Sequence, residues 1–220
     1  MRPDRPRPRG ALRPLLACLL LGTAALSGCS SLQGAGDKGY VTGDGQLEVV
    51  AAADRGAPVE LEGEDLDGKP LSLADFRGKV TVVNVWGAWC AACRVEQDDL
   101  DEAAEETRDV ARFVGIDIRD GSVENARSYV RSFDVQYPSF YSPDGKALVP
   151  FAGTLTAYTV PSTVVLDPEG RIAASILGSL PSKQTLVDLV EDTAAEDAAE
   201  DAEAGNTAGS TAGSTAGDAS

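Results

Sequence analysis

Two cysteines separated by two residues, Cys90 and Cys93, are the side chains in this sequence whose spacing best suits joint chemistry. A pair at this spacing can form a disulfide and exchange it with another one through a mixed disulfide. The 220-residue chain has no histidine, which excludes Ser-His-Asp and Cys-His catalysis, His-ligated zinc and CxxCH haem attachment. A structural zinc site needs four ligands, which this pair cannot supply within one chain. The pair is therefore expected to be redox-active, structurally disulfide-bonded or idle, with no metal and no cofactor.

The residues around the two cysteines predict a strand that leads directly into a helix. Val80–Trp86 is a dense β-branched run, typical of a buried central strand. Residues 91–110 are predicted to be helical, which places Cys90 at the helix N-terminus. Unpaired backbone N–H groups and the helix dipole favour a thiolate there. Because Cys93 follows one turn later, we expect Cys90 to attack a substrate disulfide and Cys93 to resolve the mixed disulfide.

One acidic residue of this helix, Glu96, lies on its apolar face. At about 100° per residue, Glu96 falls within the stripe that also contains Cys93, Leu100 and Ala103. A carboxylate on that face is either desolvated, with a raised pKa, or relieved by a polar partner. The alternative is that the side chain curls towards solvent.

The rest of the domain predicts an α/β fold. Asp67-Gly68 is a turn signal between residues 59–61 and 71–73, and it predicts a small N-terminal β-hairpin. The element order is ββαβαββα, which is typical of a sheet whose central strands are partly parallel. The remaining predicted strands are residues 113–118, 162–166 and 172–177, and the remaining predicted helices are residues 122–133 and about 181–191.

Two segments carry a family resemblance over roughly residues 57–190. Residues 83–94, Val-Asn-Val-Trp-Gly-Ala-Trp-Cys-Ala-Ala-Cys-Arg, resemble the active-site segment of TlpA/ResA-like thiol-disulfide oxidoreductases, which belong to the redoxin/AhpC-TSA-type superfamily. Residues 159–167, Thr-Val-Pro-Ser-Thr-Val-Val-Leu-Asp, resemble the cis-proline loop of that family. The resemblance implies a thioredoxin-like α/β fold with a central mixed sheet flanked by helices.

The same resemblance assigns roles to particular residues. It implies that Pro161 faces the cysteine pair and that the peptide group at Val160 binds the substrate backbone. It also implies that Glu96, three residues after Cys93, assists proton transfer. We expect Trp89 to form an exposed lip of the substrate groove and Trp86 to pack in the core. Since Ala91 and Ala92 separate the cysteines and no histidine stabilises a thiolate, a moderately reducing couple is expected.

The N-terminal segment predicts export and a lipid anchor. A basic stretch precedes Leu15–Leu26, which is too short for the roughly 20 residues that span a bilayer. Leu26-Ser27-Gly28-Cys29 resembles the bacterial lipobox, which implies that residues 1–28 are a signal peptide and that Cys29 is the lipid attachment site. The alternative is an ordinary secretory signal. Residues 29–56 are then predicted to be a flexible tether.

The domain is expected to span residues 57–191, and residues 192–220 are expected to form a disordered tail. That tail is acidic and rich in Ala, Gly, Ser and Thr, so it cannot bury a core. The whole chain has 19 Lys and Arg against 35 Asp and Glu, a net charge of −16. This charge argues against nucleic acid as a partner, because phosphate binding needs a basic surface.

Together these features predict a lipid-anchored thiol-disulfide oxidoreductase on the extracytoplasmic face of the cell membrane. Its expected substrates are disulfide-containing envelope proteins such as apocytochrome c, and its expected electron donor is a membrane thiol-reducing protein. One alternative is a peroxiredoxin-like antioxidant, although peroxiredoxins carry their reactive cysteine in a Thr-x-x-Cys motif. Another is a non-catalytic thioredoxin-fold module in which the pair is a permanent structural disulfide.

Overall fold

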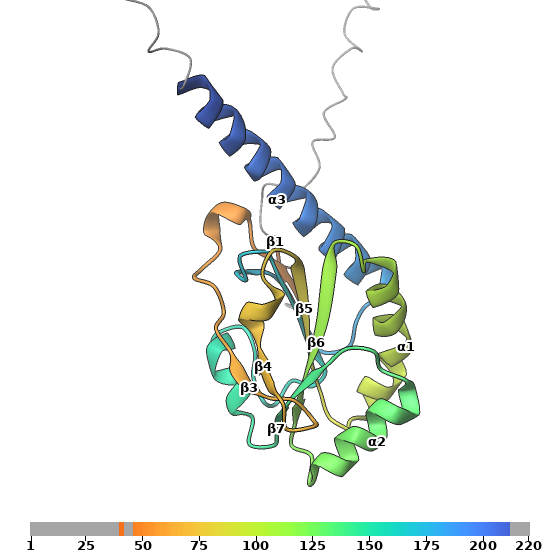
Figure 1. Cartoon of the computed structure of the whole chain (residues 1–220). Helices are drawn as coiled ribbons and strands as arrows, with labels where there is room; N and C mark the ends of the chain where they lie inside the picture. Colours follow the sequence, from red (N-terminus) through yellow and green to blue (C-terminus); the bar gives the residue numbers. More distant parts are fainter. Residues whose placement is uncertain (1–39, 42–45, 212–220) are drawn as a thin grey trace, which may run out of the picture. The chain divides into compact units, whose positions relative to one another are not determined.

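The computed structural model describes residues 40–41 and 46–211, and it describes side chains between residues 46 and 198. Within these residues, seven strands form one sheet in the order β1-β2-β9-β8-β5-β6-β7, and two more form a hairpin (Figure 1). The strands of the large sheet are β1 (Tyr40–Val41), β2 (Leu47–Val49), β5 (Val80–Trp86), β6 (Ala111–Ile118), β7 (Ser139–Ser142), β8 (Ser162–Leu166) and β9 (Ile172–Leu177).

Strand β5 lies at the centre of the sheet, as the β-branched run predicted. All seven of its residues are buried. It pairs in parallel with β6, which pairs in parallel with β7, and it pairs antiparallel with β8 on the other side. The predicted mixed sheet with a partly parallel centre is therefore confirmed.

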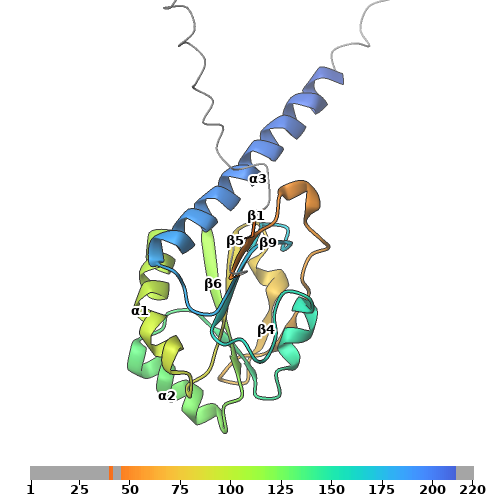
Figure 2. The same ribbon diagram turned by 180° about the vertical axis from the view of Figure 1, so that it is seen from behind.

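The two faces of the sheet are covered differently (Figures 1 and 2). The helices α1 (Ala91–Glu106) and α3 (Lys183–Thr211) pack on the face that carries Val80 and Val82. The helix α2 (Val123–Phe133) continues this layer around Trp86 and the two cysteines. The opposite face is covered by the short 3-10 helices η3 (Leu73–Phe76) and η4 (Lys146–Phe151).

The N-terminal hairpin is present, with strands β3 (Glu62–Glu64) and β4 (Pro70–Ser72). Its turn is built as the Asp67-Gly68 signal predicted. The Asp65 carboxylate accepts hydrogen bonds from the backbone N–H groups of Asp67 and Lys69, and Gly68 adopts a φ of 78°. The strands lie a little closer to the turn than predicted. Val59 and Leu61, which were expected in the first strand, precede it and pack in the core.

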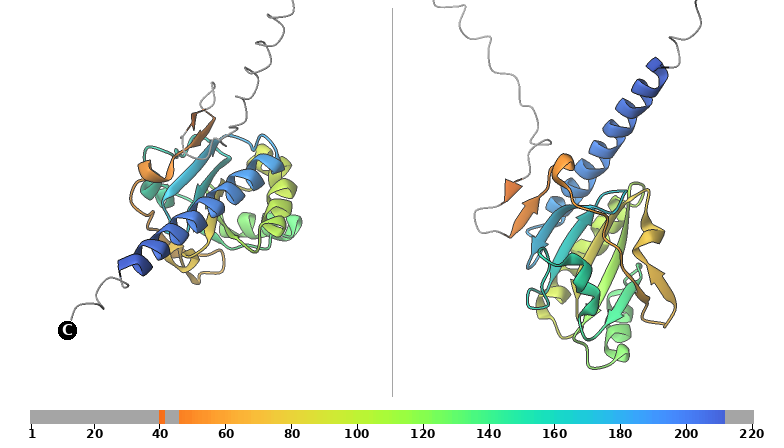
Figure 3. Two further views of the ribbon diagram at one scale, coloured as in Figure 1. Left: turned by 90° about the horizontal axis from the view of Figure 1, so that it is seen from above. Right: turned by 90° about the vertical axis from the view of Figure 1, so that its left-hand side faces the viewer.

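Two predicted boundaries of the domain are wrong. The expected tether included Leu47–Val49, but these residues form β2, which pairs antiparallel with β9 and lies next to the edge strand β1 (Figure 3). The expected tail began at residue 192, but α3 continues to Thr211. Residues 192–211 are rich in alanine and glutamate, which are good helix formers, and contain no proline. They therefore extend a helix that is already packed on the domain, although they have little apolar surface to bury themselves.

Besides β1 and β2, a third strand was not predicted. Strand β7 lies between Pro138 and Pro143, two residues that favour a loop. It is the last strand of the sheet, where prolines at the strand ends leave the hydrogen bonds of the shared edge intact. Its Phe140 is buried in the core of the η4 face.

The predicted signal peptide and the lipid site Cys29 lie outside the described residues. Among the helices of the described part of the chain, none is long and apolar enough to cross a membrane.

Candidate active site

Cys90 and Cys93 are joined by a disulfide at the N-terminus of α1. Cys90 is the N-cap residue of the helix, and its sulfur accepts a hydrogen bond of 3.1 Å from the backbone N–H of Cys93. The Cα atoms of the two residues are 5.3 Å apart. Both residues are buried. Of the three states that the spacing left open for the pair, the disulfide excludes the idle one. Cys90 also lies at the helix N-terminus, where a thiolate would be stabilised.

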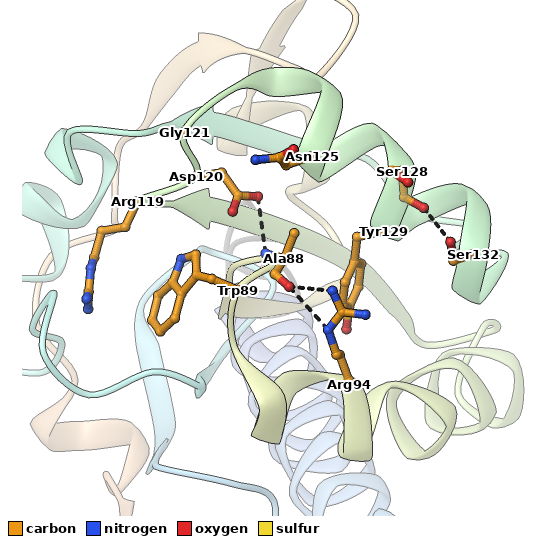
Figure 4. Close-up of a pocket in the computed structure, with 10 residues that line it drawn as sticks. All are labelled: Ala88, Trp89, Arg94, Arg119, Asp120, Gly121, Asn125, Ser128, Tyr129 and Ser132. Atoms are coloured by element: carbon orange, nitrogen blue, oxygen red, sulfur yellow. Dashed lines mark hydrogen bonds between the residues drawn. The ribbon is translucent and has the colours of Figure 1, made fainter.

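The loop before the disulfide, residues 87–89, is held on both sides (Figure 4). The backbone N–H of Ala88 donates to the carboxylate of Asp120 at 3.1 Å. The carbonyl of Ala88 accepts hydrogen bonds from Nε and Nη2 of Arg94, at 3.2 and 2.6 Å. At Gly87 a Cβ would collide with the Trp89 indole and lie 2.9 Å from the Ile118 carbonyl oxygen, so this close approach requires glycine.

Trp89 forms an exposed edge of the site, as predicted, whereas Trp86 is buried. The Trp89 side chain is 45% exposed, and its indole N–H donates to the Ile118 carbonyl at 3.0 Å. The guanidinium of Arg119 lies 4.3 Å from the centre of the Trp89 ring and donates to the Ala157 carbonyl at 3.3 Å. Arg119 therefore connects the tryptophan to the loop that leads to Pro161.

The Val160–Pro161 peptide bond is cis, as the family resemblance implied. Pro161 is buried, and its carbonyl accepts a hydrogen bond of 3.0 Å from the N–H of Gly178. Val160 is half-buried and packs against the cluster that contains both cysteines. The cis-proline loop and the disulfide thus share one part of the molecule although about 70 residues separate them.

Glu96 is both buried and partnered, so it does not curl towards solvent. Only 4% of the residue is exposed. One carboxylate oxygen accepts the N–H of Leu180 at 3.0 Å, and the other lies 3.5 Å from the amide nitrogen of Asn84. Burial raises the pKa of Glu96 from 4.5 to about 7, and the hydrogen bonds from Leu180 and Asn84 only partly oppose that rise. Glu96 can therefore gain or lose a proton near neutral pH, one helical turn from Cys93.

Tyr129 supports the second cysteine and was not identified from the sequence. Its hydroxyl donates to the Cys93 carbonyl at 2.9 Å and lies 3.0 Å from Oε1 of Gln97. Its ring packs against Trp86 with a centroid separation of 4.5 Å. Burial raises the pKa of the Tyr129 hydroxyl, so this group stays protonated and remains a donor.

A second buried carboxyl lies behind the loop. Asp117 is fully buried on β6, and neither of its carboxyl oxygens has a hydrogen-bond partner among the described residues. Burial, followed by the neighbouring Asp120, raises the pKa of Asp117 from 3.8 to about 8. At neutral pH the Asp117 carboxyl is therefore predominantly protonated.

Sequence reasoning did not identify Arg119, Asp120 or Tyr129 as parts of the site. They come from the end of β6 and from α2, and no local pattern marks them. The one usable signal was the parallel pairing of β5 with β6, which places Trp86 opposite Asp117 and so brings residues 117–121 beside the active-site loop.

The comparisons with known proteins agree with this geometry. A sequence model of the AhpC/TSA family matches residues 54–175, which is more than half of the chain. The thiol-disulfide oxidoreductase ResA of Bacillus thuringiensis subsp. konkukian is 23% identical over 148 residues, covering 67% of this chain and 80% of that protein.

Two solved structures have a similar fold and a higher sequence identity to this chain than that ResA protein. A DsbF homologue from Corynebacterium diphtheriae is 36% identical with a TM-score of 0.64, covering 69% of this chain and 96% of that one. A secreted thiol-disulfide isomerase from Corynebacterium glutamicum is 30% identical with a TM-score of 0.65, covering 71% of this chain and 99% of that one.

The disulfide at a helix N-terminus, the cis-proline loop beside the same cluster and these relatives lead to one conclusion. The chain belongs to the AhpC/TSA family and is a thiol-disulfide oxidoreductase with a thioredoxin-like fold.

Proposed function

We propose that this protein is a lipid-anchored, extracytoplasmic reductase of disulfides in envelope proteins. The observation that carries the proposal is the Cys90–Cys93 disulfide at the N-terminus of α1, which follows the exposed Trp89 and lies in the cluster against which Val160 of the cis-proline loop packs. Apocytochrome c, which must be reduced before haem attachment, is a substrate of the expected class.

The proposed reaction is a two-electron exchange. In the reduced protein, the Cys90 thiolate attacks one sulfur of the client disulfide, and the other client sulfur leaves as a thiolate that takes up a proton. The Cys93 thiolate then attacks Cys90, which re-forms the Cys90–Cys93 disulfide and releases the second client thiolate. The client gains two electrons and two protons, and a membrane dithiol donor returns the protein to its reduced form.

The surrounding residues have distinct proposed roles in this cycle. The backbone at Val160 pairs with the client chain, Pro161 holds that segment against the disulfide, and Trp89 borders the groove. Glu96, whose pKa is about 7, exchanges a proton with the Cys93 thiol or with the leaving thiolate.

Trapping of mixed disulfides tests this function. We expect Cys93→Ser to accumulate a covalent complex with a client peptide disulfide, because Cys90 attacks but nothing resolves the product. Cys90→Ser is the matched control and should trap little. The complexes are counted on non-reducing gels and by mass spectrometry. Equal trapping by both variants would contradict the assignment of roles, and no trapping together with efficient hydrogen peroxide turnover would favour the peroxiredoxin-like alternative.

The lipid anchor is a separate part of the proposal and rests on the Leu26-Ser27-Gly28-Cys29 segment. Acyl chains on Cys29 would hold the domain at the membrane surface, at about 0.8 kcal/mol per buried methylene. Cys29→Ala should then leave an unprocessed precursor or release the protein from membranes. Mass spectrometry that finds an unmodified N-terminus cleaved elsewhere would overturn the anchor but not the redox function.

A further inference from the structure

A cavity of about 370 Å³ opens beside the active-site loop, between that loop and α2 (Figure 4). Ala88 and Trp89 form one wall, and Asn125 and Ser128 of α2 form another. Because consecutive Cα atoms are 3.8 Å apart, this wall begins within one or two residues of Cys90. A client chain held by its cysteine at Cys90 can therefore reach the cavity with a neighbouring side chain.

The lining of the cavity favours a negatively charged group. Two arginines, Arg94 and Arg119, line it together with one acidic residue, Asp120. Asp120 is 6% exposed, and one oxygen of its carboxylate already accepts a hydrogen bond from the Ala88 N–H. Arg94, in contrast, is exposed. This cationic lining is a local exception on a chain whose net charge is −16.

Arg94 is held ready to bind before any client arrives. Its Nε and Nη2 donate to the Ala88 carbonyl, and its guanidinium lies 5.7 Å from the centre of the buried Tyr129 ring. Its third nitrogen, Nη1, makes no hydrogen bond within the part of the chain that the structure describes. A fixed guanidinium with a donor left over binds a carboxylate at a small cost in side-chain entropy.

We propose that this cavity is a subsite for a carboxylate of the client, supplied by an Asp or Glu side chain within about two residues of the reacting cysteine. Arg94 would bind the carboxylate, with Asn125 and Ser128 as further hydrogen-bonding groups. The subsite rests on the proposed function, because it selects among disulfide clients of the same reaction. It makes Arg94 a specificity-determining residue.

Single-turnover reduction of matched peptide disulfides tests the subsite. The peptides are acetylated and amidated, so that no terminal carboxylate competes, and differ only in Glu, Gln or Lys beside the cysteine. Pre-reduced wild-type protein is expected to reduce the Glu peptide about three- to tenfold faster than the Gln peptide at subsaturating concentration. The Lys peptide should be slowest, and added salt should shrink the Glu preference.

Arg94→Gln should bring the Glu-to-Gln rate ratio close to one. This variant also removes the guanidinium that binds the Ala88 carbonyl, so we expect all rates to fall together. The rate ratio is the readout that a purely structural role would not change. Arg131→Gln is the matched control, because Arg131 lies on α2 but does not line the cavity; its ratio should remain that of the wild type.

The outcomes separate the two proposals. If wild-type protein reduces all peptides at equal rates, or prefers Lys, the redox function stands and the subsite is overturned. A Glu preference that persists in Arg94→Gln also overturns it. If wild-type protein reduces none of the peptides, the proposed function fails and the subsite fails with it.

Discussion

The two sulfur atoms of the active site have different surroundings. Cys90 caps α1 and accepts the Cys93 N–H, so the unpaired amides of the first helical turn lie next to its sulfur. Cys93 is within the helix, and its carbonyl is fixed by the Tyr129 hydroxyl. This asymmetry favours Cys90 as the thiolate that attacks and Cys93 as the thiol that needs a base, a role for which Glu96 is the nearest carboxyl on the same helix face.

The titration of Glu96 gives a residue-scale prediction. In the reduced wild-type protein, the rate of thiol alkylation plotted against pH should change slope near pH 7, where the Glu96 carboxyl titrates. Glu96→Gln keeps the shape and the amide can still accept from Leu180, so the fold should survive while the inflection disappears and exchange slows. Asp98→Asn, an exposed change on the same helix, should leave the profile unchanged. Superimposable profiles for wild type and Glu96→Gln would refute a proton-transfer role.

At the scale of elements, a buried charge cluster joins three segments that are far apart in the chain. Arg55 follows the 3-10 helix η2 (Ala52–Asp54), and its side chain is 2% exposed. Its guanidinium pairs with Asp167 at the β8–β9 turn, 3.4 Å away, and with Glu196 of α3. Arg171 also binds Asp167, at 2.7 Å. The cluster fixes the middle of α3 against the sheet, which explains why the helix is part of the domain beyond residue 191.

Truncation tests this contribution of α3. Deleting residues 192–220 removes Glu196 and the buried Thr193, and it leaves Asp167 as the only one of the two carboxylates that pair with Arg55. We expect the free energy of unfolding to fall by about 2 kcal/mol, because a buried charge loses one of its partners. Deleting only residues 212–220 keeps both contacts and should change little. The comparison is made by urea denaturation, and equal stabilities of the two truncated proteins would show that residues 192–211 do not stabilise the domain.

At the scale of the whole molecule, two buried carboxyls make stability depend on pH. The pKa of Glu96 is raised to about 7 and that of Asp117 to about 8, from ordinary values of 4.5 and 3.8. For each carboxyl, at a pH between its ordinary pKa and its raised pKa, the folded protein keeps a proton that the unfolded chain releases. Stability is therefore greatest on the acid side of this window and is lost as the pH rises through 7 and 8.

Denaturation of the oxidised protein at two pH values measures this dependence without interference from titrating thiols. The free energy of unfolding should be lower at pH 9 than at pH 5.5, by on the order of a few kcal/mol. The double variant Glu96→Gln, Asp117→Asn should show a much smaller difference. A wild-type stability that is level or rises over this range would mean that neither carboxyl is protonated in the folded state at neutral pH.

The amino-acid sequence by itself determined the C-x-x-C pair, its place at the start of a helix and the central strand, and the family resemblance implied the cis-proline loop. These features are local: the C-x-x-C spacing sets the reach between the two sulfur atoms, and a run of β-branched residues forms a strand wherever it can be buried. Helical periodicity also placed Glu96 on the apolar face of its helix, but it left open whether the carboxyl stays buried or reaches solvent.

The tertiary structure alone decided which groups surround that pair. Leu180 and Asn84 reach Glu96, and Arg119 and Asp120 reach the active-site loop, from positions distant in the chain. The tertiary structure also decided the edge strand β7 and the two ends of the domain. There, the short apolar run of β2 becomes a strand by pairing with β9, and the alanine-rich stretch after residue 191 extends the packed helix α3. Such contacts form only when the sheet brings separate segments together, and the pairing register that does so leaves no signature within any one of them.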